Sequence, residues 1–333
     1  MLTEEDDVSR LRVLLLVAVL VAAGLTVSAA PASADVGGLS NGVADDGARV
    51  ISETFVEWQK LDIVIDSPAM KGQTPVRLLL PKDYFTQPDR KWPTLYLLHG
   101  CCEPADYRSW TQFTDVYDFM YDRNVLVVMP SDGLAGYYSD PRGSGPKYET
   151  YHITELQQII ERGYRGSSTR AIAGLSVGGF GAFSYAARHP GRFAAAASYS
   201  GLLDTLTPGA PTAIEWMRRQ ANESLFSLWG DPILNRSTWA AHNPASNLSG
   251  LRGTRLYLSC GDGRAADLDQ NDDFVWQETA ALLTTQSFVA KARAAGLSPT
   301  VRFYGRGTHT WPYWQREFKN SWPMLASALG VPA

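Results

Sequence analysis

The sequence has almost no excess of charge of either sign. Its 30 Lys and Arg residues nearly balance 34 Asp and Glu residues, which gives a formal net charge of -4 at pH 7. Proteins that bind nucleic acid need a basic face, so this composition argues against a nucleic-acid partner. The chain is 45% hydrophobic and 19% charged, as expected for a globular domain, and we find no internal repeat in it.

Cysteine is also scarce: the chain contains only Cys101, Cys102 and Cys260. Their spacing does not resemble a zinc site, and we expect neither a metal nor a cofactor. The odd number means that at least one thiol stays free or pairs outside the chain. A bridge between the adjacent Cys101 and Cys102 would be strained. A bridge from Cys260 to their loop needs Cα atoms within about 7 Å, which the expected strand order does not provide.

Long apolar runs are missing apart from one at residues 13–27, near the start of the chain. Arg10 and Arg12 precede this run, and an A-x-A motif at residues 32–34 follows it, as in a secretory signal peptide. The run is shorter than the roughly 20 apolar residues that a membrane-spanning helix needs. We therefore expect residues 1–34 to be cleaved and the protein to be secreted or associated with the cell wall, with no membrane span in its mature form.

Residues 35–50 are rich in Gly and Asp and are expected to be a flexible lead-in to one domain at 51–333. In that domain, apolar segments typical of buried parallel strands lie at 94–100, 125–133, 170–176, 193–201, 254–261 and 301–305. Helical patterns lie at 114–124, 148–164, 178–190 and 276–296. This alternation predicts a single, monomeric α/β domain, with a mostly parallel central sheet and helices on both faces. In such domains, ligands bind at the carboxyl ends of the strands.

The segment GLSVG, residues 174–178, matches the G-x-S-x-G motif between a predicted strand and a predicted helix. In α/β-hydrolases a tight turn lifts this serine above the sheet, and the glycines provide the clearance. We therefore predict that Ser176 is a nucleophile. The expected oxyanion donors are the backbone N–H groups of Val177 and of Cys101, which follows the strand at 94–100.

A serine nucleophile needs a base, and this fold places its histidine after the last strand. His309 lies at that point, directly after the segment predicted as the last strand, and is predicted to be the general base. His242 lies in a polar segment before the strand at 254–261, while His99 and His189 are interpreted as structural.

The acid of the site stays open at this stage, because several carboxylates follow the strand at 254–261. Asp262 comes first after that strand, and Glu278 lies in the following helical segment. Part of a calcium-loop pattern is also present, with Asp272 where that loop requires Gly. The residues that match the pattern are Asp267, Asp269, Asn271 and Glu278.

Several segments resemble the antigen 85 type of mycolyltransferase, a group within a wider esterase family of the α/β-hydrolase fold. The similarity is collinear from about residue 60 to 330. The matching segments are LYLLHGCCEPADYRSW (95–110), MPSDGLAGYYSDP (129–141), KYETYHITELQQII (147–160), AGLSVGGFGAFSYAARHPGRFAAAASYSGLLD (173–204), YLSCGDG (257–263) and GTHTWPYW (307–314).

The resemblance implies a Ser-Glu-His triad in which Glu278 takes the role of the acid and Asp262 is the fallback. It also implies that Cys102, Asp204 and Trp311 belong to the substrate pocket. Cys102 stands where the family has an arginine that holds trehalose, so the resemblance implies the same chemistry with an acceptor that need not be trehalose.

The sequence therefore predicts a secreted serine esterase or acyltransferase. Its substrate would be a small ester or a glycolipid, and water or a sugar hydroxyl would take the acyl group. The alternative is a non-catalytic surface or matrix-binding protein on the same fold, because a fold does not determine a function. A broken triad would favour this alternative, and all three positions are intact.

Overall fold

The computed structural model describes residues 42–333. The predicted signal peptide lies outside the described residues, as does the first part of the predicted lead-in. Within residues 42–50, Ala44 and Ala48 are buried, and the first strand begins at Arg49. No helix in the described range is long and apolar enough to cross a membrane.

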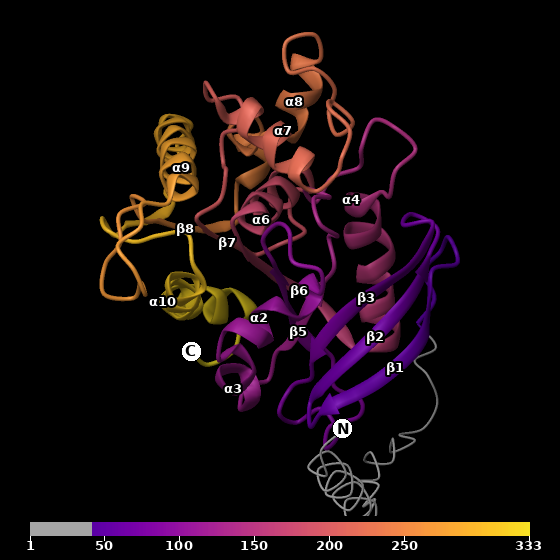
Figure 1. Cartoon of the computed structure of the whole chain (residues 1–333). Coiled ribbons are helices and arrows are strands. Elements are labelled where there is room, and N and C mark those ends of the chain that lie inside the picture. The colour runs from indigo at the N-terminus through magenta and orange to yellow at the C-terminus, as the bar shows by residue number, and fades with distance from the viewer. Residues whose placement is uncertain (1–41) are drawn as a thin grey trace, which may run out of the picture. The chain divides into compact units, whose positions relative to one another are not determined.

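A nine-stranded sheet runs through the domain in the spatial order β1-β2-β3-β5-β4-β6-β7-β8-β9 (Figure 1). The strands β4 to β9 pair in parallel, whereas β1, β2 and β3 form antiparallel pairs and join the parallel part through β5. This arrangement confirms the predicted mostly parallel α/β sheet. The strands are β1 Arg49–Glu57, β2 Lys60–Ser67, β3 Gly72–Leu79, β4 Trp92–Leu98, β5 Leu126–Pro130, β6 Gly166–Leu175, β7 Ala195–Tyr199, β8 Arg255–Cys260 and β9 Thr300–Phe303.

Helices cover both faces of this sheet, as predicted (Figure 1). On one face lie α2 Ser109–Phe113, α3 Val116–Tyr121 and α10 Trp311–Leu329. The other face is covered by α4 Tyr148–Thr150, which continues through a π-helical turn into α5 Gln157–Gly163, and by α6 Val177–Arg188 and α9 Trp276–Ala294. Between β7 and β8 the chain also forms α7 Ala210–Gln220 and α8 Arg236–His242.

Strand β4 shows why one sheet supports two cores. Successive side chains of a strand point to opposite faces. Leu95 and Leu97 therefore pack with α2, α3 and α10, whereas Tyr96 and Leu98 pack with α6 and its neighbours. All four side chains are buried, so the strand must be apolar at every position. This is the pattern that identified the parallel strands in the sequence.

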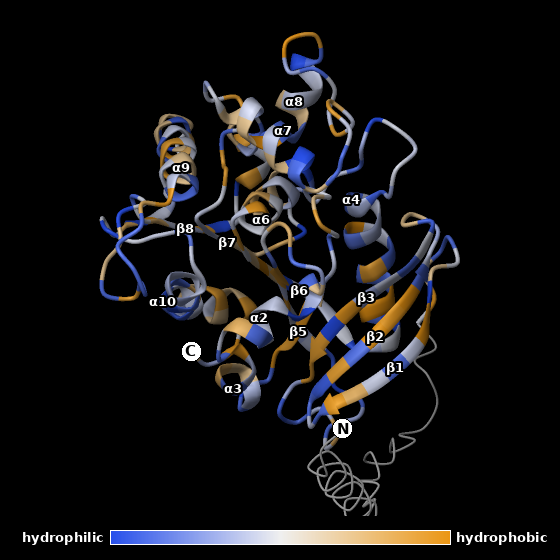
Figure 2. Ribbon diagram, viewed as in Figure 1, coloured by the Kyte–Doolittle hydropathy of each residue, from blue (hydrophilic) through white to orange (hydrophobic). Residues whose placement is uncertain are grey.

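The elements missed by the sequence analysis have a different pattern. In β2, buried positions alternate with partly exposed ones, and β1 is mostly exposed. Blue and orange residues accordingly alternate along β2 (Figure 2). A search for continuous apolar runs misses such strands, whereas a search for period-2 alternation would have found β2. The sequence analysis did not predict the helix α10. This helix starts inside the GTHTWPYW motif, which was interpreted as part of the site.

Candidate active site

Ser176 lies in the sharp turn between β6 and α6. Its φ of 50° is unusual for a residue with a side chain, and its N–H donates to the Tyr199 carbonyl oxygen at 2.8 Å. A side chain at Gly174 would collide with the Gly178 carbonyl, and one at Gly178 would collide with the His99 carbonyl. The two glycines are therefore needed where β6, α6 and the loop after β4 approach one another most closely.

The structure brings Ser176, His309 and Glu278 together from three distant parts of the chain. His309 Nε2 lies 2.9 Å from Ser176 Oγ, and His309 Nδ1 lies 2.7 Å from Glu278 Oε2. An ionised carboxylate can only accept, so Nδ1 must hold the proton that donates to Glu278. The lone pair of Nε2 then faces the Ser176 hydroxyl, which is the arrangement that a general base requires.

Glu278 is fully buried in the first turn of α9. Its Oε1 accepts hydrogen bonds from the Ser200 hydroxyl at 2.9 Å and from the Gly261 N–H at 2.6 Å. These donors, together with the helix N-terminus, stabilise a buried negative charge and leave Oε2 for His309.

Asp262, the fallback acid, pairs with Arg264, whereas His309 pairs with Glu278. Its carboxylate accepts a hydrogen bond from Arg264 Nε at 3.0 Å, and this interaction lowers the pKa of Asp262. The residues of the calcium-loop pattern also do not gather around one point. Glu278 faces His309, and Asp269 accepts hydrogen bonds from Thr308 and Tyr313. Within residues 42–333, no group of three or more His, Cys, Asp or Glu residues is arranged to hold a metal ion.

The two predicted oxyanion donors flank the serine. Val177 is the first residue of α6, and Cys101 lies in the loop after β4. Among the described residues, neither N–H donates to a protein acceptor, so both remain available for a ligand. The next residue, Cys102, has a φ of 78°, and its N–H donates to the Leu134 carbonyl oxygen at 3.0 Å.

The three cysteines are now assigned. Cys101 and Cys102 are disulfide-bonded, although we expected a bridge between neighbours to be unfavourable. Cys260 is a free and buried thiol, whose pKa is raised by burial and by the nearby Glu278. This agrees with the expectation that Cys260 does not pair with the loop after β4.

A cavity of about 510 Å³ opens above Ser176. This volume suits a small organic ligand. Its lining includes two residues that the sequence analysis assigned to the substrate pocket, Cys102 and Trp311. The other lining residues are mainly apolar or aromatic: Gly100, Cys101, Glu103, Leu175, Leu202, Ala213, Trp216, Met217, Gln220, Trp276, Gln277, Ala280, His309, Thr310 and Trp314.

Asp204, the third predicted pocket residue, does not line this cavity. Its buried carboxylate accepts hydrogen bonds from Lys291 Nζ and Ser287 Oγ, both at 2.6 Å. Burial raises the pKa of Asp204, but these donors, with Asn243, outweigh burial and lower it overall. Asp204 thus ties the segment after β7 to α9, and its contact with a substrate stays a prediction.

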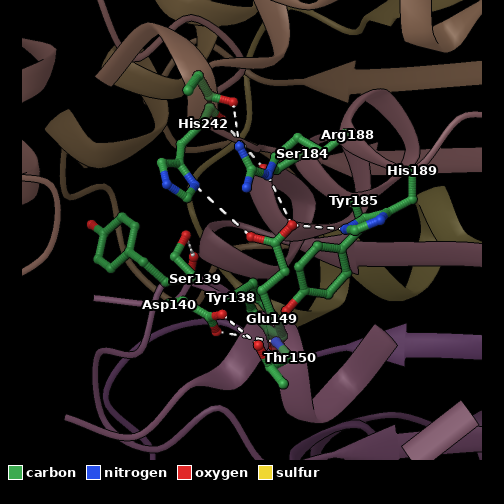
Figure 3. Close-up of polar contacts among 12 residues, drawn as sticks. Tyr138, Ser139, Asp140, Glu149, Thr150, Ser184, Tyr185, Arg188, His189 and His242 are labelled. Carbon is green, nitrogen blue, oxygen red and sulfur yellow. Dashed lines mark hydrogen bonds and ion pairs between the residues drawn. The ribbon is translucent and has the colours of Figure 1, made fainter. Parts of the chain in front are cut away.

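The other histidines lie in structural networks. His99 Nδ1 donates to its neighbour's carbonyl oxygen at 2.5 Å, and Nε2 accepts from the Asp132 N–H at 3.0 Å, below the oxyanion loop. His189 ends α6, and His242 lies at the end of α8 rather than in an open loop. Both face the buried Glu149, together with Arg188 (Figure 3).

Two supporting residues were missed by the sequence analysis. The Ser200 hydroxyl donates to Glu278 and accepts from Trp314 Nε1 at 3.1 Å. Trp314 also packs edge-on against the His309 ring, with the ring centres 4.9 Å apart. Ser200 directly follows β7, and the end of a parallel strand is the signal that could have identified it.

Together, the doubly wound sheet and the serine turn with its His-Glu pair define the class: this is an α/β-hydrolase. The chain belongs to the esterase family that includes the antigen 85 proteins. Residues 67–325 match the family model described as "Putative esterase". The chain is 30% identical over 257 residues to the diacylglycerol acyltransferase/mycolyltransferase Ag85B of Mycobacterium intracellulare, covering 72% of this chain and 76% of that protein.

Three further proteins are similar to this chain in sequence or in fold. The chain is 35% identical over 195 residues to Esterase MT1326 of Mycobacterium tuberculosis, covering 56% of this chain but only 42% of the longer relative. Among solved structures, Mycobacterium tuberculosis MPT51 (FbpC1) superposes with a TM-score of 0.68 at 22% identity, covering 79% of this chain and 96% of that one. An S-formylglutathione hydrolase from Agrobacterium tumefaciens has a TM-score of 0.62 at 17% identity, covering 84% and 99%. At these identities the two structures establish the fold alone.

Proposed function

We propose that this protein is a serine esterase or acyltransferase that works through an acyl-serine intermediate. The observation that supports this most directly is the continuous hydrogen-bonded path from Ser176 through His309 to Glu278, at the base of a mainly apolar cavity. The proposed mechanism uses only groups of the protein. The names of the esterase and acyltransferase relatives support the same reaction class.

In the first half-reaction, Ser176 Oγ attacks the ester carbonyl carbon while His309 Nε2 takes the hydroxyl proton. The carbonyl oxygen becomes an oxyanion, which the N–H groups of Val177 and Cys101 are placed to bind. The intermediate collapses, the carbon–oxygen bond to the alcohol breaks, and His309 returns the proton to the leaving alcohol. Glu278 stabilises the imidazolium that exists between these two transfers.

In the second half-reaction, His309 takes a proton from water or from a sugar or other alcohol, which attacks the acyl-serine. The intermediate then collapses, the bond to Ser176 Oγ breaks, and His309 returns the proton to Ser176 while a free acid or a new ester leaves. Exclusion of water from the cavity would favour the acyltransferase, because the two acceptors compete for one intermediate. We propose a small ester or a glycolipid as the substrate.

The sequence features at the start of the chain extend the proposal to location. We propose a secreted or cell-wall-associated monomer in which residues 1–34 are removed and residues 51–333 form the enzyme domain. The bridge between Cys101 and Cys102 is compatible with an oxidising compartment.

The first test compares the mature protein with its Ser176→Ala variant on p-nitrophenyl esters of increasing chain length, with and without trehalose or glucose. We expect kcat/KM to fall at least about 10⁴-fold in the variant. Acylated sugar among the products would identify a transferase, and free acid alone an esterase. If the mature protein and the Ser176→Ala variant are both folded and neither hydrolyses any of the esters, the non-catalytic binding protein becomes the better hypothesis.

A further inference from the structure

The connection between α7 and α8 exposes two large aliphatic side chains that no part of the proposed mechanism uses. Ile233 is 83% exposed and Leu234 is 85% exposed, the highest values among the large hydrophobic residues of the described chain. We call this pair the apolar wedge. Figure 2 shows the orange tip of this connection above α8. Single exposed aliphatic residues are common, but two at the tip of one loop need a physical explanation.

Hydrogen bonds to the backbone of the wedge fix the conformation of its loop. Asp231 Oδ1 accepts the N–H of Ile233 and the N–H of Leu234, each at 2.9 Å, and the Asn235 N–H donates to the Asp231 carbonyl oxygen at 2.8 Å. Behind the loop, the fully buried Trp239 donates from Nε1 to the Gly230 carbonyl oxygen at 2.9 Å. These contacts fix the loop while both aliphatic side chains point away from the core, so their exposure does not result from an unformed loop.

Apolar residues, together with the charged Glu215, Arg219 and Asp231, line the surface between the wedge and the active-site cavity. A second hollow of about 540 Å³ is lined by Pro232 beside the wedge, by Leu225 and Phe226, and by Trp216. Trp216 is 50% exposed and also lines the cavity above Ser176. The surface formed by Trp216, Leu225, Phe226 and the wedge is called the rim patch below. A second rim tryptophan, Trp276 of α9, contacts Trp216 with ring centres 5.7 Å apart.

We infer that the rim patch docks on a lipid–water interface, with the wedge inserted among the acyl chains. Aliphatic side chains at a loop tip gain free energy by leaving water for hydrocarbon, whereas a rigid protein partner would need a matching cavity. The apolar residues beside the wedge, with Trp216 shared by the hollow and the cavity, also suit an occupant that must move from the interface to Ser176. This second step, delivery of an ester lipid to Ser176, rests on the proposed function, but docking itself does not.

The test measures docking on the Ser176→Ala protein, so that catalysis cannot change the membrane. Cosedimentation with phosphatidylcholine vesicles should show binding that persists when NaCl rises from about 0.1 M to about 1 M, because burial of apolar surface is not screened by salt. The double variant Ile233→Ser/Leu234→Ser should lower the vesicle partition coefficient at least about tenfold. The partition coefficient of the single variant Leu234→Ser should lie between those of the parent and the double variant.

The matched control is Phe55→Ser/Val56→Ser, which also removes two exposed apolar side chains, but from β1 at the far edge of the sheet. It should bind vesicles as the parent does. The inference is overturned if the parent does not bind, if salt releases it, or if the control loses binding equally. It is also overturned if light scattering finds a dimer that only the wedge variant dissociates, since the patch would then join two copies.

A final measurement separates this inference from the proposed function. With Ser176 intact, the wedge variant should hydrolyse a dissolved short ester at the parental rate but an emulsified ester at least about tenfold more slowly. If the parent binds vesicles but hydrolyses neither ester, the proposed function fails while docking stands. If the wedge variant and the parent hydrolyse the emulsified ester equally fast, delivery through the rim patch is excluded.

Discussion

At the scale of single residues, Glu278 and Asp262 illustrate how two nearby carboxylates acquire different environments. Asp262 directly follows β8 and pairs with Arg264 near the surface, with 19% of its side chain exposed. Glu278 lies in the following helix, is fully buried, and receives hydrogen bonds from Ser200 and Gly261. Glu278 therefore has hydrogen-bond donors on one oxygen and His309 on the other, whereas Asp262 has no contact with the histidine among these bonds.

The substitution Glu278→Gln should therefore lower kcat for an activated ester by about 10²- to 10⁴-fold and change KM little, because the amide retains the shape but not the charge. Asp262→Asn is the matched control and should keep kcat within about twofold. The measurement is steady-state hydrolysis of a p-nitrophenyl ester by both variants. A large loss of kcat in Asp262→Asn with little loss in Glu278→Gln would show that the acid is assigned to the wrong residue.

At the scale of elements, the loop after β4 is held from several sides. The Tyr138 hydroxyl donates to the His99 carbonyl oxygen at 2.9 Å, and Trp110 Nε1 donates to the Leu98 carbonyl oxygen at 2.9 Å. The bridge between Cys101 and Cys102 restricts the backbone just where one of the two proposed oxyanion donors lies. Preorganisation of such a donor is what makes it effective in stabilising a transition state.

This loop leads to a simple prediction about thiols. The unreduced, unfolded mature protein should react with one equivalent of a thiol reagent, at Cys260, and the reduced protein with three. The variant Cys260→Ser should give no reaction before reduction. If the unreduced parent, isolated from an oxidising compartment, shows three reactive thiols, the loop does not contain a disulfide.

At the scale of the whole molecule, buried histidines link folding to pH. His152 Nε2 donates to the Ser131 carbonyl oxygen and Nδ1 accepts from the Tyr185 hydroxyl, each at 2.9 Å, which is the pattern of a neutral ring. Burial lowers the pKa of His152 to about 4. Burial and the positive charge of Arg188 lower the pKa of His242 to about 4 as well. Both rings are therefore neutral in the folded protein at pH values where the unfolded chain is already protonated.

The free energy of unfolding should consequently fall as pH drops from about 6.5 to about 4, because the unfolded state binds more protons across this range. Each of the two histidines contributes about 3 kcal/mol to the full loss. Burial raises the pKa of Glu155 to about 7 and the pKa of Asp132 well above its ordinary value. Both carboxyl groups act in the opposite direction, so the net slope is smaller than the two histidines alone would give.

Urea unfolding at several pH values measures this slope, and His242→Asn should make it shallower. If His242→Asn and the parent have the same slope between these pH values, the His242 ring is not held neutral in the folded state.

The sequence by itself determined the α/β class, the serine turn and the histidine that faces Ser176, because these depend on local patterns. Continuous apolar runs mark strands buried on both faces, and G-x-S-x-G reflects a turn in which Gly174 and Gly178 have no room for side chains. Strand β2 escaped this search because its signal is alternation, and the edge strand β1 escaped it because most of its positions are exposed.

Only the tertiary structure decided which acid faces His309, whether Asp204 reaches the cavity, and how the cysteines pair. Each depends on segments that are far apart in the sequence and meet only when the sheet is assembled. His309 and Glu278 are 31 positions apart, and His309 and Ser176 are 133 apart. Sequence spacing contains no information about the direction of a side chain at such separations. Hydrogen-bond geometry in the folded protein supplies it, because donors and acceptors act only over about 3 Å.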